Sequence, residues 1–238
     1  MTTCSTCSTL QDMQNEKRTF SLGLRAESWP LLILVTAAGG FSASYSFLAR
    51  GGVFAFAQTG NIIYSGHVLA SGRFWQIIPF LLPALSYMLG LLAARQLERR
   101  LEDKVRFQKR ILLLESFLLL LTSQLPASAL MTRISLCLMG CASGLQMETF
   151  HRVGDREYTS IMVMGNMKRT VEAFGSYLED HQPASLRKAL VYILINGIFC
   201  LGSAWGYVLT QAQGDTAILL PALFLALAAW RLQPASRG

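Results

Sequence analysis

Charged residues are almost missing from a long N-terminal part of the chain. Between Trp29 and Ala94, a stretch of 66 residues, the only formal charges are Arg50 and Arg73 when His67 is counted as neutral. The whole chain of 238 residues is 15% charged, against roughly a quarter in ordinary soluble domains. A soluble domain needs a more polar surface, so we predict an all-α protein that crosses a membrane several times. A soluble helical bundle is the alternative.

Hydropathy predicts six membrane-spanning helices and two ambiguous segments. The six lie at residues 29–49, 74–94, 109–127, 133–151, 187–210 and 216–232. The apolar run at 111–150 is too long for one crossing, and it divides near Pro126 and Arg133. The ambiguous segments each contain a Gly-Asn pair, and we name residues 53–72 and 158–178 the first and the second Gly-Asn segment.

The distribution of Lys and Arg distinguishes six crossings from eight. With six crossings and a cytoplasmic N-terminus, 18 of the 21 Lys and Arg residues lie inside, and Arg50, Arg73 and Arg133 lie outside. With eight crossings the two sides receive nearly equal numbers, and Lys168 and Arg169 fall within the bilayer. The positive-inside rule therefore predicts six crossings of the bacterial inner membrane, with both termini in the cytoplasm.

The remaining composition indicates no further domain. Residues 1–28 are polar and rich in Ser and Thr, so we expect a disordered cytoplasmic tail before two membrane repeats at 29–127 and 128–238. Cys4 and Cys7 form a lone pair in this tail, and such a pair is more often incidental than a metal or redox site. Basic loops explain the net charge of +7. We expect no nucleic-acid partner, no metal and no cofactor.

A short pattern occurs in both halves of the chain. The stretches "SFLARGGVFAFAQTGN" (46–61) and "TFHRVGDREYTSIMVMGN" (149–166) each hold a polar residue before Phe, then a glycine, then Gly-Asn. Each copy follows the first span of a three-span unit. Because three is odd, the two units have opposite orientations, and the Gly-Asn segments enter from opposite faces. Two inverted three-span repeats with broken helices are a recurring architecture of secondary transporters.

The Gly-Asn pairs are the candidate binding elements. Glycine allows the backbone to turn, and an asparagine amide either satisfies freed peptide groups or meets a solute. A helix that begins just after the pair points its positive dipole end toward the break, which favours an anion or a carbonyl oxygen. The predicted substrate-binding residues are Thr59, Gly60, Asn61, Gln146, Gly165 and Asn166. The alternative is that each pair makes a tight turn between packed helices.

Ionisable residues in predicted spans are candidates for proton or cation coupling. Glu115 lies inside the third span, and its alternative role is an ion pair with Lys109 or Arg110. Glu148 lies near the cytoplasmic end of the fourth span, and its alternative is a pair with Arg152 at i+4.

Three further features each concern a single helix. His67 is expected to be either a hydrogen-bonded packing residue or a pH-sensitive group in an outward-facing vestibule. Gly202 and Gly206 form a small face that allows close helix packing. Apolar residues recur at intervals of 3 and 4 in the second Gly-Asn segment, which predicts an amphipathic helix along the cytoplasmic face of the bundle. These residues are Met164, Met167, Val171, Phe174 and Leu178.

These motifs resemble the YoaK family of bacterial membrane proteins, a group of unknown function. The matching residues are "SFLARGGVFAFAQTGN", Gly144-Leu145-Gln146, "TFHRVG" and "MGNMKRTVEAF", and the resemblance runs from about residue 30 to 232. Ala43 stands where the family usually has an Asp in its first span, and Met164 replaces the Thr of the second triplet. The resemblance implies a multi-pass membrane fold and no established activity.

The chain has none of the common catalytic motifs, so we predict no catalytic residues and no enzyme. The leading hypothesis is a small-solute transporter or channel with a central site between the two Gly-Asn segments. The alternative is a non-transporting scaffold or sensor in which the Gly-Asn pairs are structural turns. The expected partners are the lipid bilayer and an unidentified small solute, and a homo-oligomer is compatible with the sequence.

Overall fold

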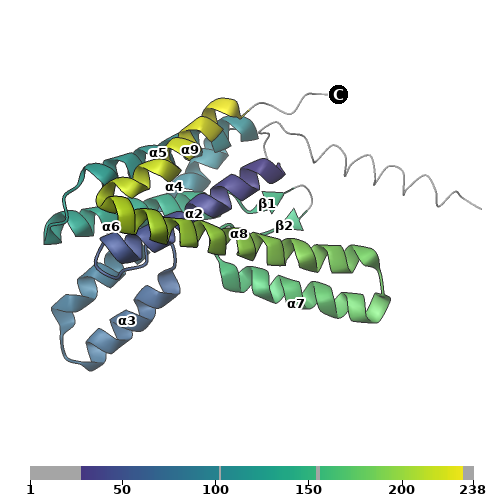
Figure 1. Ribbon diagram of the computed structural model, residues 1–238, viewed down its shortest axis with the longest axis horizontal. Coiled ribbons are helices and arrows are strands. Elements are labelled where there is room, and N and C mark those ends of the chain that lie inside the picture. Colours follow the sequence, from purple (N-terminus) through teal and green to yellow (C-terminus); the bar gives the residue numbers. More distant parts are fainter. Residues whose placement is uncertain (1–27, 102, 154–155, 233–238) are drawn as a thin grey trace, which may run out of the picture.

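The computed structural model describes residues 28–101, 103–153 and 156–232, which form a bundle of helices (Figure 1). The helices are α2 (Trp29–Ala49), α3 (Gln58–Ala70), η1 (Phe74–Ile77), α4 (Ile78–Arg100), α5 (Lys104–Gln124), α6 (Ala129–Thr149), α7 (Val163–Asp180), α8 (Pro183–Gln213), η2 (Gly214–Ile218) and α9 (Leu219–Arg231). A two-residue antiparallel ladder joins β1 (Arg152–Val153) to β2 (Arg156–Glu157). Residues 1–27 of the predicted tail at 1–28, with Cys4 and Cys7, lie outside the described residues.

Each predicted span overlaps a helix, and the helical fold class is confirmed. Three helical stretches among the described residues are long and apolar enough to cross a membrane: Trp29–Ala49, Phe74–Arg100 and Pro183–Arg231. The other two predicted spans correspond to α5 and α6, which are not among these three stretches. In the Gly-Asn segments, α3 begins at Gln58 and α7 at Val163, so each Gly-Asn pair lies within the first turn of its helix. The prediction that each helix begins just after the pair is therefore wrong.

Local sequence signals explain where several helices begin and end. Pro30 and Pro183 occupy the first turn of their helices, where a missing N–H costs nothing. Asp103 caps α5 by accepting the N–H groups of Val105 and Arg106. Gly214 ends α8 with φ 60°, a value that favours glycine.

Helix pairs in the first half of the chain have counterparts in the second half. Helix α2 packs mainly against α8 and α4 packs mainly against α6, while α5 lies against α9 and α6. Helix α3 packs against α4, and α7 against α8. The largest buried cluster contains Val35, Phe41, Leu112, Met139 and Leu225, from α2, α5, α6 and α9.

Glycines set the distance between the two main helix pairs. A Cβ at Gly202 of α8 would overlap the carbonyl of Ala37 in α2, and a Cβ at Gly206 would lie 2.6 Å from the Phe41 carbonyl. This confirms the predicted close packing. The α4–α6 pair uses the same device, since a Cβ at Gly144 would overlap the Tyr87 carbonyl.

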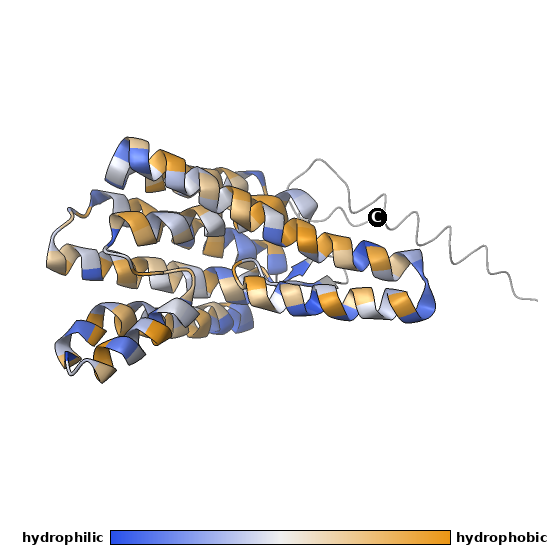
Figure 2. Cartoon of the chain, turned by 60° about the horizontal axis from the view of Figure 1, so that its bottom comes forward, coloured by the Kyte–Doolittle hydropathy of each residue, from blue (hydrophilic) through white to orange (hydrophobic). Residues whose placement is uncertain are grey.

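Two hairpins project from the bundle in different directions (Figure 1). One consists of α3 with the start of α4, and the other of α7 with the start of α8. Hydrophilic residues gather at the tip of the α7–α8 hairpin (Figure 2). The predicted amphipathic helix is present as α7, but it packs against α8 and leaves its apolar stripe exposed. The exposed fraction of these side chains runs from 46% at Phe174 to 73% at Met164.

Candidate functional site

The side chain of Asn61 fastens the non-helical residues ahead of α3 to the start of that helix. Its Oδ1 accepts a hydrogen bond from the Phe54 N–H (3.1 Å), and its Nδ2 donates to the Phe54 carbonyl. Nδ2 also donates to Oε1 of Gln58 (2.9 Å). Asn61 is fully buried, so its amide satisfies backbone groups that lack partners outside a helix. We name this pair of bonds to one residue an asparagine clasp.

An asparagine clasp of the same geometry lies in the second Gly-Asn segment. Asn166 Oδ1 accepts from the Thr159 N–H (3.0 Å), and Asn166 Nδ2 donates to the Thr159 carbonyl (2.7 Å). In both halves the clasped residue stands seven positions before the asparagine, and Asn166 follows Asn61 by 105 residues. A third hydrogen bond also recurs 105 residues later in the chain. Ser65 donates to the Asn61 carbonyl (2.8 Å), and Thr170 donates to the Asn166 carbonyl (2.9 Å). The halves therefore share hydrogen-bond geometry as well as sequence.

The glycine before each asparagine provides space for the clasped residue. A Cβ at Gly60 would lie 3.1 Å from the ring of Phe54, and a Cβ at Gly165 would lie 3.4 Å from Thr159 Oγ1. Neither of these two glycines has a positive φ. The left-handed backbone that turns the first segment lies earlier, at Gly51 (φ 79°) and Gly52 (φ 75°).

Both Gly-Asn segments lie against the same part of α6. In the first segment, the Ala55 carbonyl accepts a hydrogen bond from Ser143 Oγ (2.9 Å). In the second, Ile161 packs beside Gly39 of α2, where a Cβ would lie 2.6 Å from Ile161 Cγ2 and 2.8 Å from Gln146 Nε2. Gln146 follows Ser143 by three residues, about one helical turn. The two segments thus come together between α2 and α6.

The asparagine amides are occupied within the chain. Asn61 donates both N–H groups inside its own segment, and Asn166 donates one to its segment and one to Asn196 Oδ1 of α8 (3.3 Å). Thr59 is exposed, and both Gly60 and Gly165 are half-buried. The substrate-binding role of these residues stays a prediction.

Unsatisfied polar atoms lie where the segments meet. Gln146 is fully buried and donates from Nε2 to the Val35 carbonyl (2.9 Å), but its Oε1 has no hydrogen-bond partner among the described residues. Ser160, next to Ile161, is 1% exposed, and its Oγ also lacks a partner in the described part of the chain. Buried polar atoms are normally paired, so these two atoms have unused hydrogen-bonding capacity.

The profile of the family described as "Protein of unknown function (DUF1275)" matches residues 31–230. The chain belongs to the DUF1275 family. The YoaK-like resemblance of its motifs agrees with this membership. No curated protein and no solved structure matches the chain significantly.

A polar cavity of about 530 Å³ adjoins the second Gly-Asn segment of this DUF1275 protein. It is lined by residues of β2, α7 and α8: Glu157, Arg169, Glu172, Ala173, Ser176, Ser185, Lys188 and Tyr192. Arg169 Nη2 lies 3.6 Å from Glu157 Oε2, and Tyr192 donates to the Glu157 carbonyl (2.9 Å). Glu157 stands two residues before Thr159, but neither Thr159 nor Asn166 lines the cavity, which lies along the α7–α8 hairpin.

Glu115 is buried in the DUF1275 bundle without a partner. It is 1% exposed, and neither carboxyl oxygen has a hydrogen-bond partner in the described chain. The alternative pairing with Lys109 or Arg110 is therefore not present. Its helix face also carries Ile111 and Leu112, both fully buried.

The other two ionisable candidates have different surroundings. Glu148 forms an ion pair with Arg95 of α4 (2.9 Å), and not with Arg152 as the i+4 spacing suggests. His67 is exposed, and its ring lies 6.0 Å from the ring of Tyr64. Among the described residues, no group of three or more His, Cys, Asp or Glu side chains is placed to hold a metal ion.

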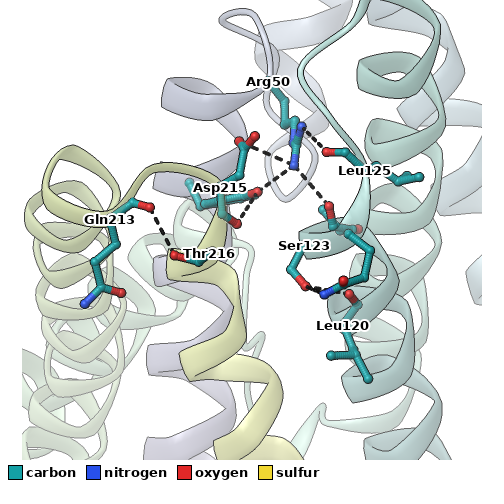
Figure 3. A network of polar contacts seen from close by, with 10 residues as sticks. Arg50, Leu120, Ser123, Leu125, Gln213, Asp215 and Thr216 are labelled. Carbon is teal, nitrogen blue, oxygen red and sulfur yellow. Dashed lines mark hydrogen bonds and ion pairs between the residues drawn. The ribbon is translucent and has the colours of Figure 1, made fainter.

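Sequence reasoning missed a buried arginine network in the DUF1275 chain (Figure 3). Arg50 is fully buried and donates to the carbonyls of Thr122 (3.0 Å) and Leu125 (3.2 Å) and to the Tyr45 hydroxyl (2.9 Å). Its Nη2 also lies 3.5 Å from Asp215 Oδ1. The network joins the end of α2 to the end of α5 and to η2. The sequence did contain a sign of this network, because Arg50 is one of only two formally charged residues between Trp29 and Ala94.

Proposed function

We propose that this DUF1275 protein is a small-solute transporter or channel of the bacterial inner membrane. In this proposal six helices cross the membrane, both termini are cytoplasmic, and the solute binds between the two Gly-Asn segments. The observation that carries the proposal is the meeting of both segments at one turn of α6, at Ser143 and Gln146. Interrupted helices that meet near the centre of a bundle form the solute site in many transporters.

Two inverted repeats, 29–127 and 128–238, are part of the proposal. Helix α2 of the first half corresponds to α6 of the second, and α4 corresponds to α8. The contact of α2 with α8 therefore has its counterpart in the contact of α6 with α4. The asparagine clasps at Asn61 and Asn166 correspond in the same way. Three crossings in each half place the clasps on opposite sides of the membrane centre.

The short length of α3 and the hydrophilic tip next to α7 support partial crossings. Helix α3 has 13 residues, or about 20 Å, against roughly 30 Å for the hydrocarbon core. Helix α7 has 18 residues and continues into a hydrophilic tip (Figure 2). We infer that each helix starts near the membrane centre and leaves on the side from which its segment entered.

The starts of α3 and α7 indicate which solutes fit. Neither helix has a side-chain cap at its N-terminus, whereas α5 and α6 are capped by Asp103 and Ser128. Uncapped N–H groups and the positive end of the helix dipole favour anionic or carbonyl oxygens. Oε1 of Gln146 has no hydrogen-bond partner in the described chain and is free to accept a hydrogen bond from a donor on the solute. We propose a small solute that carries both an oxygen acceptor and a hydrogen-bond donor.

One observation favours the alternative of a scaffold or sensor. Both amide N–H groups of Asn61 and of Asn166 are used inside the chain, as structural turns require. In that case the segments hold the bundle together and bind no solute.

A solute screen on purified protein tests the proposal. Thermal stability is measured across libraries of ions and metabolites, because a ligand that binds the folded state raises it. The dissociation constant of each stabilising compound is then compared in Gln146→Met, Ser160→Ala and Ser135→Ala. We expect the first two changes to raise the dissociation constant roughly two- to tenfold, which corresponds to the loss of one hydrogen bond to the solute.

Ser135→Ala is the matched control, because Ser135 is also fully buried with a partnerless Oγ in the described chain, but lies earlier in α6. A dissociation constant equal to that of the wild type in all three variants would exclude a site between the Gly-Asn segments. A library without any stabilising compound would favour the scaffold or sensor.

A further inference from the structure

Three buried polar residues stand in line along α5. Gln108, Glu115 and Thr122 recur every seventh residue, and their exposed fractions are 2%, 1% and 0%. Residues seven apart lie on one helix face, about 10 Å from each other. Between them the same face is apolar, with Ile111 and Leu119 fully buried. We name the three residues the α5 polar column.

Charged groups stand at the two ends of the α5 polar column. At one end, Arg50 donates to the Thr122 carbonyl and lies beside Asp215, whose side chain is 36% exposed. At the other end, Gln108 lies in the basic first turns of α5, and its Oε1 has no partner among the described residues. Glu115 lies midway between an ion pair with access to solvent and a positively charged helix end.

The charged residues of the elements packed against α5 lie near the ends of those elements. None of them reaches Glu115 within hydrogen-bond distance in the described chain. They are Arg95, Glu98, Arg99 and Arg100 of α4, Arg133 and Glu148 of α6, Asp215 of η2 and Arg231 of α9. A buried carboxylate without a counter-ion is strongly unfavourable, so this position favours the neutral acid.

We propose that Glu115 is a proton-binding site that exchanges one proton through the α5 polar column and couples this exchange to solute movement. The carboxylic acid releases its proton to water that reaches the column, and the carboxylate that remains takes up a proton from the other side. The coupling rests on the proposed transporter function, whereas proton binding does not.

Infrared difference spectroscopy of the full chain in lipid nanodiscs tests proton binding without any solute. The probe is the carbonyl stretch of a protonated carboxyl group, recorded at neutral pH against alkaline pH. We expect this band in the wild-type protein and in Glu148→Gln, and its loss in Glu115→Gln and Glu115→Met. Glu148→Gln is the control because Glu148 is ion-paired to Arg95. A band that persists in both Glu115 variants, or is missing from the wild type, would overturn the proposal.

Coupling is tested separately with a compound from the solute screen. Its dissociation constant should change at least tenfold between neutral and alkaline pH in the wild type and be independent of pH in Glu115→Gln. If the infrared band belongs to Glu115 but the pH dependence survives in Glu115→Gln, the coupling is refuted and the proton site stands. If no compound binds but the band belongs to Glu115, the transporter proposal fails and proton binding is confirmed.

Discussion

Arg50 and Asp215 are 165 residues apart in the sequence and form an ion pair of 3.5 Å at the end of the bundle where α2, α5 and η2 meet. The arginine is fully buried and the aspartate is partly open to solvent. The arginine therefore depends on its partners far more than the aspartate does. This difference can be measured.

Arg50→Met should lower the free energy of unfolding by roughly 3 kcal/mol, because it removes three hydrogen bonds, two of them to buried acceptors, and leaves carbonyls unpaired. Asp215→Asn should have a smaller effect, since Arg50 keeps its bonds to Thr122 and Leu125. Thermal or denaturant unfolding in detergent measures both. Arg73→Met is the control, because Arg73 is exposed. Equal effects at Arg50 and Arg73 would contradict the network.

Asn166→Leu should destabilise the protein by about 2 kcal/mol or more, since the Thr159 N–H and carbonyl lose their partner. Asn196→Leu removes only one acceptor of a 3.3 Å bond from a half-buried residue and should cost clearly less. Hydrogen exchange of the Thr159 amide measures the clasp directly. Fast exchange in the wild type would show that the clasp does not form in solution.

Gly202→Ala should disrupt the α2–α8 contact, because the added methyl group overlaps the Ala37 carbonyl. Gly197→Ala lies in the same helix with nothing within 4 Å of the new Cβ, and it should be neutral or stabilising by up to about 1 kcal/mol. Unfolding midpoints of the two variants provide the comparison. The same midpoint in both would mean that α2 and α8 pack less closely.

Reporter fusions check the proposed topology. A fusion after Gln213 should read as external and one after Lys104 as cytoplasmic, because six crossings place 18 of the 21 basic residues inside. The opposite result at both positions would reverse the orientation. Two cytoplasmic signals would mean that α5, α6 and α8 do not cross as proposed.

Most helix positions follow from the sequence, because apolar length and proline placement decide them locally. Residues 29–49 were predicted to the residue, and Pro183 explains why α8 starts four residues before the predicted 187. Helix α3 begins five residues after the predicted start of its segment, because Gly51 and Gly52 turn the chain and the residues before Gln58 stay extended or bent.

The candidate site was only partly predictable. The repeated Gly-Asn pattern located both segments, but no spacing rule connects an asparagine to the backbone seven residues earlier in non-helical chain. The partners of Arg50 were hidden for another reason, since two of them are carbonyls of residues 72 and 75 positions away. The sequence showed that Glu115 lies inside an apolar segment. That its carboxyl group has no hydrogen-bond partner in the described chain depends on how the helices pack, which the sequence does not show.

The asparagine clasps have a consequence for biosynthesis. Each clasp closes a loop of only eight residues, so it can form as soon as that stretch has left the ribosome, before α4 or α8 exists. The contact between α2 and α8 has to wait until more than 200 residues have been made, because Gly202 and Gly206 belong to it. In the proposed membrane topology, each Gly-Asn segment can thus reach the insertion machinery already bent, while α2 remains without its main packing partner until synthesis is nearly complete.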